Sequence, residues 1–71
     1  MTLPERLVEI RKSRNLTQKQ LAAGVNISEV GLQNYENGRR KPAYDVLIAL
    51  ADFFNVSLDY LCGRSDDPTI H

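Results

Sequence analysis

The chain has little cysteine and histidine and no tryptophan. It contains one Cys and one His in 71 residues. A single thiol, Cys62, cannot form a disulfide within the chain, which fits a reducing compartment. One thiolate and one imidazole also provide too few ligands for a zinc-type site, unless chains share the site.

Long apolar runs are also missing from the sequence. No stretch is long and apolar enough to cross a bilayer, and no signal-peptide core is present. We therefore expect a cytoplasmic protein. The sequence also lacks an acid–base pair around a nucleophile and a glycine-rich phosphate loop, so we expect neither an enzyme nor a bound cofactor.

The formal net charge is zero, and this balance alone argues against a nucleic-acid partner. The charges are unevenly distributed, however. Residues 1–41 carry eight basic and four acidic side chains, whereas residues 42–71 carry one basic and five acidic side chains. A phosphate-facing amino-terminal part is one interpretation, and an ordinary solvated surface is the other. Charge alone does not decide between them.

The apolar spacing and the capping residues predict a single all-α domain. The prolines lie outside the periodic segments or at their starts, and runs of β-branched residues are absent. Four segments begin with a residue suited to a helix N-cap, namely Thr2, Thr17, Ser28 and Ser57. Glu5 and Gln20 complete capping boxes at the first two.

The ends of the predicted helices carry residues that accept a left-handed conformation. These are Asn15, Asn26, Asn37-Gly38, Asn55 and Gly63. An amphipathic fourth helix is indicated by Leu47, Leu50, Ala51 and Phe54. We expect five helices in a domain covering residues 1–64, followed by a flexible tail over residues 65–71.

The predicted helices that start at Thr17 and Ser28 are short, capped and connected by three or four residues. This arrangement is typical of a helix-turn-helix. In this motif the second helix projects its first side chains into a major groove about 12 Å wide. The first helix holds the angle of the second, and the small side chain of Ala22 permits their close approach.

Five segments in the expected order resemble the phage Cro and repressor family, also called the XRE family. They are LTQKQLA (16–22), VNIS (25–28), YENGRRKP (35–42), LIALA (47–51) and NVSLDYL (55–61). The resemblance extends from about Arg6 to Arg64. It implies a compact five-helix domain like that of the lambda repressor, with the helix-turn-helix formed by helices 2 and 3.

The resemblance implies a role for each matching position. The base-reading residues would be Ser28, Glu29, Val30, Gln33 and Asn34. The phosphate-contacting residues would be Gln18, Lys19, Asn37, Arg39, Arg40 and Lys41. Arg11 and Glu36 match a structural ion pair of the family. Without the resemblance, Gln18 is an ordinary first-turn residue and residues 39–41 are a solvated charge run.

The chemistry of the reading positions agrees with these roles. Val30 suits a thymine methyl group, Asn34 can pair bidentately with adenine, and Glu29 can accept from cytosine N4. Two residues are unusual. Gly31 costs a helix about 1 kcal/mol relative to Ala, and it either allows close approach to DNA or is merely tolerated. Glu29 either contacts a base or only stabilises the helix dipole.

The sequence predicts a sequence-specific regulator that binds double-stranded DNA and represses a bacterial or phage promoter by occlusion. A module this small favours a homodimer on a near-palindromic operator. Helix five and the C-terminal end would form the dimer contact, with Phe53, Tyr60 and Cys62 as candidate apolar contributors; the alternative is that these three residues belong to the core. No small-molecule ligand is evident. The alternative is a protein-interaction module of the same fold, such as an antitoxin or an antagonist-binding regulator, which zero net charge and Glu29 favour.

Overall fold

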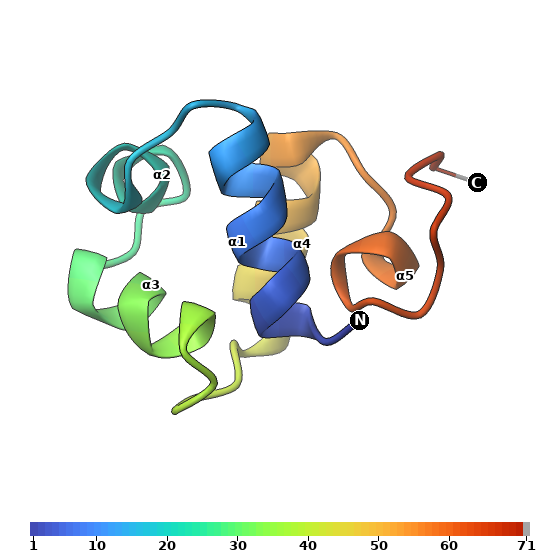
Figure 1. The fold of residues 1–71 in the computed structure, drawn as a ribbon. Helices are drawn as coiled ribbons and strands as arrows, with labels where there is room; N and C mark the ends of the chain where they lie inside the picture. Colours follow the sequence, from blue (N-terminus) through green and yellow to red (C-terminus); the bar gives the residue numbers. More distant parts are fainter. Residues whose placement is uncertain (71) are drawn as a thin grey trace.

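The computed structural model describes residues 1–70, and over that range it contains helices and no strand. The helices are α1 (Leu3–Ser13), α2 (Gln18–Gly24), α3 (Glu29–Glu36), α4 (Tyr44–Phe54) and α5 (Leu58–Leu61). Figure 1 shows α2 and α3 at one end of the molecule, α1 and α4 in the middle and α5 at the other end. The prediction of an all-α, five-helix domain is confirmed. None of these helices has the length and apolar character needed to cross a membrane.

The predicted N-caps are all present. Thr2 and Thr17 form complete capping boxes with Glu5 and Gln20, and the Ser28 and Ser57 side chains accept hydrogen bonds from the third residue of their helices. A side-chain cap of this kind stabilises a helix by about 1 kcal/mol. Helix α4 differs, because it begins after Ala43 without a side-chain cap.

The predicted stops are also confirmed by the backbone. Asn15, Asn26 and Asn55 have φ values of 56°, 59° and 57°. At Gly63 the φ is 78°, and a Cβ atom there would overlap the carbonyl group of Met1. Glycine is therefore required at this position, both because of its positive φ and because the backbone of residues 1–2 packs closely against it.

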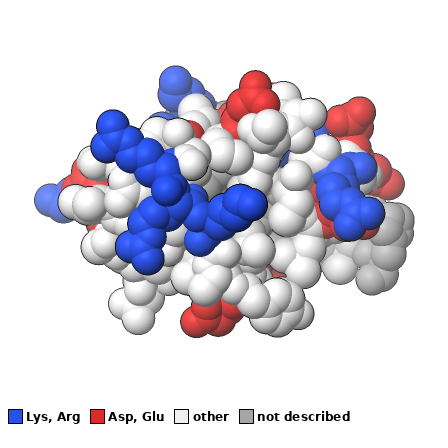
Figure 2. Space-filling model, turned by 90° about the horizontal axis from the view of Figure 1, so that it is seen from below, with Lys and Arg blue, Asp and Glu red and all other residues white. Residues whose placement is uncertain are grey.

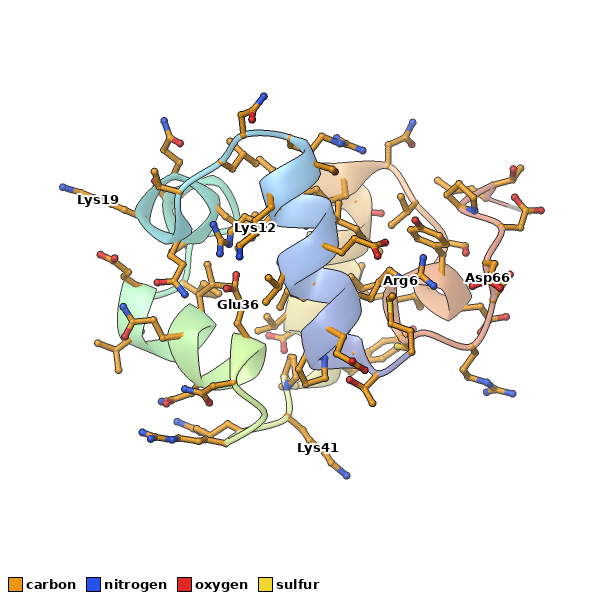
Figure 3. The ribbon with its side chains drawn as sticks, viewed as in Figure 1. Arg6, Lys12, Lys19, Glu36, Lys41 and Asp66 are labelled. Atoms are coloured by element: carbon orange, nitrogen blue, oxygen red, sulfur yellow. The ribbon has the colours of Figure 1, made fainter. Side chains whose placement is uncertain are left out.

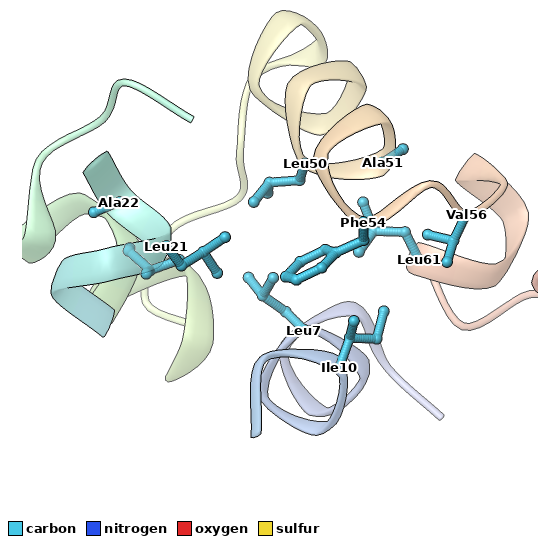
Figure 4. Close-up of a cluster of buried hydrophobic side chains, with 10 residues drawn as sticks. Leu7, Ile10, Leu21, Ala22, Leu50, Ala51, Phe54, Val56 and Leu61 are labelled. Atoms are coloured by element: carbon cyan, nitrogen blue, oxygen red, sulfur yellow. The ribbon is translucent and has the colours of Figure 1, made fainter. Parts of the chain in front are cut away.

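One hydrophobic core joins all five helices. Its largest fully buried side chains are Leu7, Leu21, Leu32, Leu50, Phe54 and Leu61. Figure 4 shows Leu7 of α1, Leu21 of α2, Leu50 of α4 and Leu61 of α5 around the ring of Phe54. Each buried side chain of this size contributes about 1.5–3 kcal/mol. This core fixes the position of α3 relative to the rest of the domain through Leu32.

The described part of the expected tail, residues 65–70, has no helix but folds back on the domain. The Ser57 backbone N–H donates to the Pro68 carbonyl at 3.0 Å. Arg6, buried beside α5, donates to Asp66 at 3.2 Å and stacks on the Tyr60 ring at 3.8 Å. Figure 3 shows Arg6 and Asp66 facing each other. His71, the last residue of the expected tail, lies outside the described residues, and the flexibility of the tail stays a prediction.

Candidate nucleic-acid interface

Helices α2 and α3 are joined by a tight connection of four residues. Its geometry depends on the left-handed Asn26 and on a hydrogen bond of 3.0 Å from the Ile27 N–H to the Ala22 carbonyl. Ala22 is 2% exposed. A larger side chain at this position would separate α2 from its neighbours, so the connection needs both residue types.

The predicted base-reading residues lie along the first turns of α3. Ser28, Glu29 and Val30 are exposed, whereas Gln33 and Asn34 are partly buried. Val30 is 64% exposed, which is high for a β-branched apolar side chain in a domain with a complete core. The structure therefore brings the predicted residues together on one helix and leaves its first turn open to solvent.

Ser28 and Gly31 are linked within this first turn. The Ser28 hydroxyl accepts a hydrogen bond of 2.9 Å from the Gly31 N–H. A Cβ atom at Gly31 would lie 3.0 Å from the same hydroxyl oxygen. The glycine thus leaves room for the Ser28 cap, a local explanation that the sequence did not offer.

Glu29 forms no ion pair within the part of the chain that the structure describes. Its carboxylate stands in the first turn of α3, where a negative charge is favourable for the helix dipole. Both interpretations of Glu29, base contact and helix stabilisation, agree with this position.

A buried polar network fixes the far end of α3. The predicted ion pair between Arg11 and Glu36 is present and bidentate, with N···O distances of 2.7 and 3.1 Å. The Arg11 guanidinium also donates to the Leu16 carbonyl at 2.8 Å. Figure 3 shows Glu36 reaching from α3 toward α1. This network ties α3 to the end of α1 and to the segment that leads into α2.

Gln18 belongs to the same network. Its side-chain amide donates to Glu36 Oε1 at 3.1 Å, so it supports α3 from the start of α2. This supporting contact agrees with the expected buttress, and its expected phosphate contact stays a prediction. The sequence alone did not identify Glu36 as the partner, because the pairing depends on how α2 and α3 pack.

The basic loop, defined here as residues 39–41, follows α3 directly. Its side chains are exposed and form no ion pair among residues 1–70. The Asn34 carbonyl accepts from the N–H groups of Arg39 and Arg40, and the Asn37 side chain accepts from Arg39 N–H at 3.0 Å. The loop is therefore held close to α3. Figure 2, which views the molecule of Figure 1 from below, shows a group of Lys and Arg side chains on this lower face.

Lys19 projects from α2, at the end of the molecule that also holds α3, and Lys41 projects from the basic loop below α3 (Figure 3). Both side chains are exposed. Helix α3 is thus flanked by cations on two sides. Uncompensated cations beside an exposed helix are the usual electrostatic footprint of a surface that meets a polyanion.

The candidate dimer residues do not form a single cluster on α5. Phe53 is 41% exposed, and its ring packs edge-to-face on Phe54 and covers Gly24 of α2. Tyr60 instead lies under Arg6 of α1, and Cys62 is partly buried. The two rings therefore pack on different helices, and the dimer contact stays a prediction.

The sequence pattern of a protein family described as helix-turn-helix matches residues 7–61. The chain belongs to this helix-turn-helix family. The match covers α2, α3 and the connection between them, and it confirms the resemblance found in the sequence.

Named members of the helix-turn-helix family are close in sequence. The chain is 42% identical over 66 residues to the HTH-type transcriptional regulator ImmR of Bacillus subtilis, covering 93% of this chain and 52% of that protein. It is 41% identical over 64 residues to the cryptic phage CTXphi transcriptional repressor RstR of Vibrio cholerae, covering 90% and 57%. The chain thus spans about half the length of the curated relatives it matches.

Solved structures of a repressor share the fold of this chain. The P22 c2 repressor, solved in complex with a synthetic operator, superposes with a TM-score of 0.85 at 28% identity, covering 92% of this chain and 98% of that one. The DNA-binding domain of the same repressor in solution gives a TM-score of 0.81 at 30% identity, covering 86% and 80%. The predicted repressor-like architecture is therefore confirmed.

Proposed function

We propose that this chain binds double-stranded DNA in a sequence-specific manner and regulates transcription by inserting α3 into the major groove. The observation that carries the proposal is the exposed first turn of α3, on a helix whose far end is held by the network of Arg11, Gln18 and Glu36. A recognition helix needs this combination, because its reading side chains must be free while its orientation is fixed. The operator complex of the P22 c2 repressor supports the same arrangement.

The proposed contacts separate into two kinds. Ser28, Glu29, Val30, Gln33 and Asn34 would face the base edges, and Gln18, Lys19, Asn37, Arg39, Arg40 and Lys41 would face the phosphates. Contacts to bases supply specificity, whereas contacts to phosphates set the register of the protein on the duplex. The base-facing set lies at the N-cap and along α3, and the phosphate-facing set lies at the start of α2, at the C-cap of α3 and in the basic loop, which supports this division.

We further propose that the regulator represses its promoter by occlusion, acts in the cytoplasm and carries out no chemical step. The relatives that are named as phage repressors support this sign of regulation, whereas one relative is named as a transcriptional activator. A single module of 71 residues buries little surface on DNA, which favours a homodimer on two half-sites separated by about one helical turn of DNA.

Selection of bound sequences from a pool of random duplexes tests the proposal. We expect enrichment of a near-palindromic sequence, and the apparent Kd for it should rise steeply with salt because each neutralised phosphate contributes about 0.9 to the log–log slope. A promoter carrying that sequence should be silenced by the full chain in a reporter strain. A pool without enrichment, bound with no salt dependence, would exclude the proposal.

A protein-interaction module of the same fold is the second candidate. The zero net charge favours it, and so does Glu29 in the first turn of α3, which forms no ion pair with residues 1–70. This candidate predicts no salt-dependent association with any duplex, so the titration that tests DNA binding also separates the two functions.

A further inference from the structure

A hollow opens between the start of α1, the end of α3, the basic loop and the start of α4. Its volume is about 410 Å³. The apolar part of its lining comes from Leu3, Pro4, Tyr35, Pro42 and Leu47. Figure 1 shows the start of α1 and the loop after α3 close together at the lower edge of the molecule. The hollow is therefore assembled from segments far apart in sequence, and no motif marks it.

Two cations complete the lining of this hollow. Arg40 and Lys41 line it, and no acidic side chain does. Neither cation forms an ion pair within residues 1–70. The Thr2 hydroxyl, also in the lining, already donates to Glu5 at 2.9 Å. The hollow thus combines an apolar wall with unneutralised positive charge.

This combination defines the chemistry of a ligand. Small-molecule sites typically have volumes of about 300–1,000 Å³, with mostly apolar walls and a few polar groups that orient the ligand. The hollow, with a volume of about 410 Å³, lies at the lower end of this range and suits a ligand with a single ring or a short branched chain. Carboxylates pair favourably with Arg and Lys, and aromatic bodies pack well on Tyr and Pro surfaces.

We propose that this hollow binds a small carboxylic acid with an aromatic body, whose carboxylate pairs with Arg40 and Lys41. Its ring packs among Leu3, Tyr35 and Leu47. The proposed function assigns the same two cations to DNA phosphates. The predicted effect of the acid on DNA binding therefore rests on the proposed function. An acid seated here neutralises charge on the basic loop and weakens the complex with DNA.

The first test uses the full chain without DNA. Phenylacetate is titrated into ¹⁵N-labelled protein, with phenylacetamide as its uncharged counterpart. We expect saturable shifts confined to the backbone amides of residues 2–3, 35, 38–41 and 47. Phenylacetamide should bind about tenfold more weakly because it lacks the charge-assisted contacts. Shifts scattered over the surface, no saturation, or equal binding of the two compounds would overturn the site.

A charge-removing variant sharpens this test. The double substitution R40Q and K41Q should weaken phenylacetate binding about tenfold and leave phenylacetamide binding unchanged, since only the charged contacts are lost. The matched control is R64Q, which removes an exposed cation beyond α5 and outside the hollow. An equal loss in the control, or no loss in the double variant, would contradict the proposal.

The second test measures the link to DNA. With the selected operator, saturating phenylacetate should raise the Kd and lower the salt slope by about one, whereas the same concentration of acetate should do neither. An unchanged Kd would overturn the link. A protein that binds no duplex but gives the expected amide shifts would refute the proposed function and leave the ligand site standing, so the two failures are distinguishable.

Discussion

Glu36 ties the end of α3 to α1 and to the start of α2. Its carboxylate accepts three hydrogen bonds, two from Arg11 and one from Gln18, while its side chain is 5% exposed. A buried charge is tolerable only when its partners are complete, because removing one partner leaves the other charge uncompensated.

We therefore predict that Glu36→Gln lowers the free energy of unfolding by about 3 kcal/mol, the range for breaking a buried pair from one side. The control is Glu9→Gln. Glu9 contacts Arg6 at 3.7 Å and its side chain is 50% exposed, so the change should cost less than about 1 kcal/mol. Urea unfolding of both variants provides the measurement. Similar losses in the two variants would mean that the network does not brace α3.

The proposed division between reading and positioning residues is tested by a pair of alanine variants. Asn34→Ala should relax selection at one operator position by about 1–3 kcal/mol, because a bidentate base contact is lost. Arg40→Ala should weaken all sequences alike and reduce the salt slope by about one. Binding profiles over a library of operator variants measure both effects. Parallel profiles for the two variants would show that the assignment of Asn34 is wrong.

At the scale of elements, the helix boundaries are encoded locally and the contacts between helices are not. Thr2, Thr17, Ser28 and Ser57 predicted their helix starts because a cap depends on neighbours three residues away. The start of α4 at Tyr44 could not be located in this way, since Ala43 offers no cap and the apolar pattern begins at Leu47.

The candidate site shows the same limit. The sequence identified the residues of α3 and the basic loop, because their types and spacing follow a family pattern. It did not reveal that Gln18 contacts Glu36, that Arg6 lies between Tyr60 and Asp66, or that four segments enclose a hollow. Each of these contacts joins residues that only the packing of the helices brings together.

The capping box of α1 makes a prediction about pH. Hydrogen bonds from the Thr2 backbone N–H and hydroxyl hold the pKa of Glu5 below its ordinary value. The folded state thus favours the carboxylate, and its stabilisation is present at neutral pH and is lost as the pH falls through the folded pKa. The free energy of unfolding, measured at a series of pH values, should be higher for the wild type than for Glu5→Gln at neutral pH. This difference in free energy should shrink as the pH falls. A difference independent of pH would contradict the linkage.

At the scale of the whole molecule, the hydrophobic core is complete without the tail, residues 65–70. The fully buried side chains lie between Leu7 and Leu61, whereas Asp66, the tail partner of Arg6, is exposed to solvent. Ion pairs with an exposed partner contribute about 0–1 kcal/mol. Arg6 also keeps its stacking on Tyr60 without the tail.

We predict that a chain truncated after residue 64 stays folded and loses only about 1 kcal/mol of stability. Its amide spectrum should match that of the full chain except near Arg6 and Ser57, whose partners lie in the tail. The prediction fails if truncation collapses the spectral dispersion, since that outcome would make the tail part of the cooperative unit.

The exposed first turn of α3 has a consequence for how such a protein diverges over generations. Glu29 and Val30 contribute nothing to the core, and the helix keeps its cap at Ser28 and its anchor at Leu32 whichever side chains stand between them. Substitutions at these two positions leave the folded state almost unchanged in stability. Under the proposed function, a duplicated copy of the gene can therefore acquire a new set of target promoters through changes at these two positions, without passing through an unfolded ancestor.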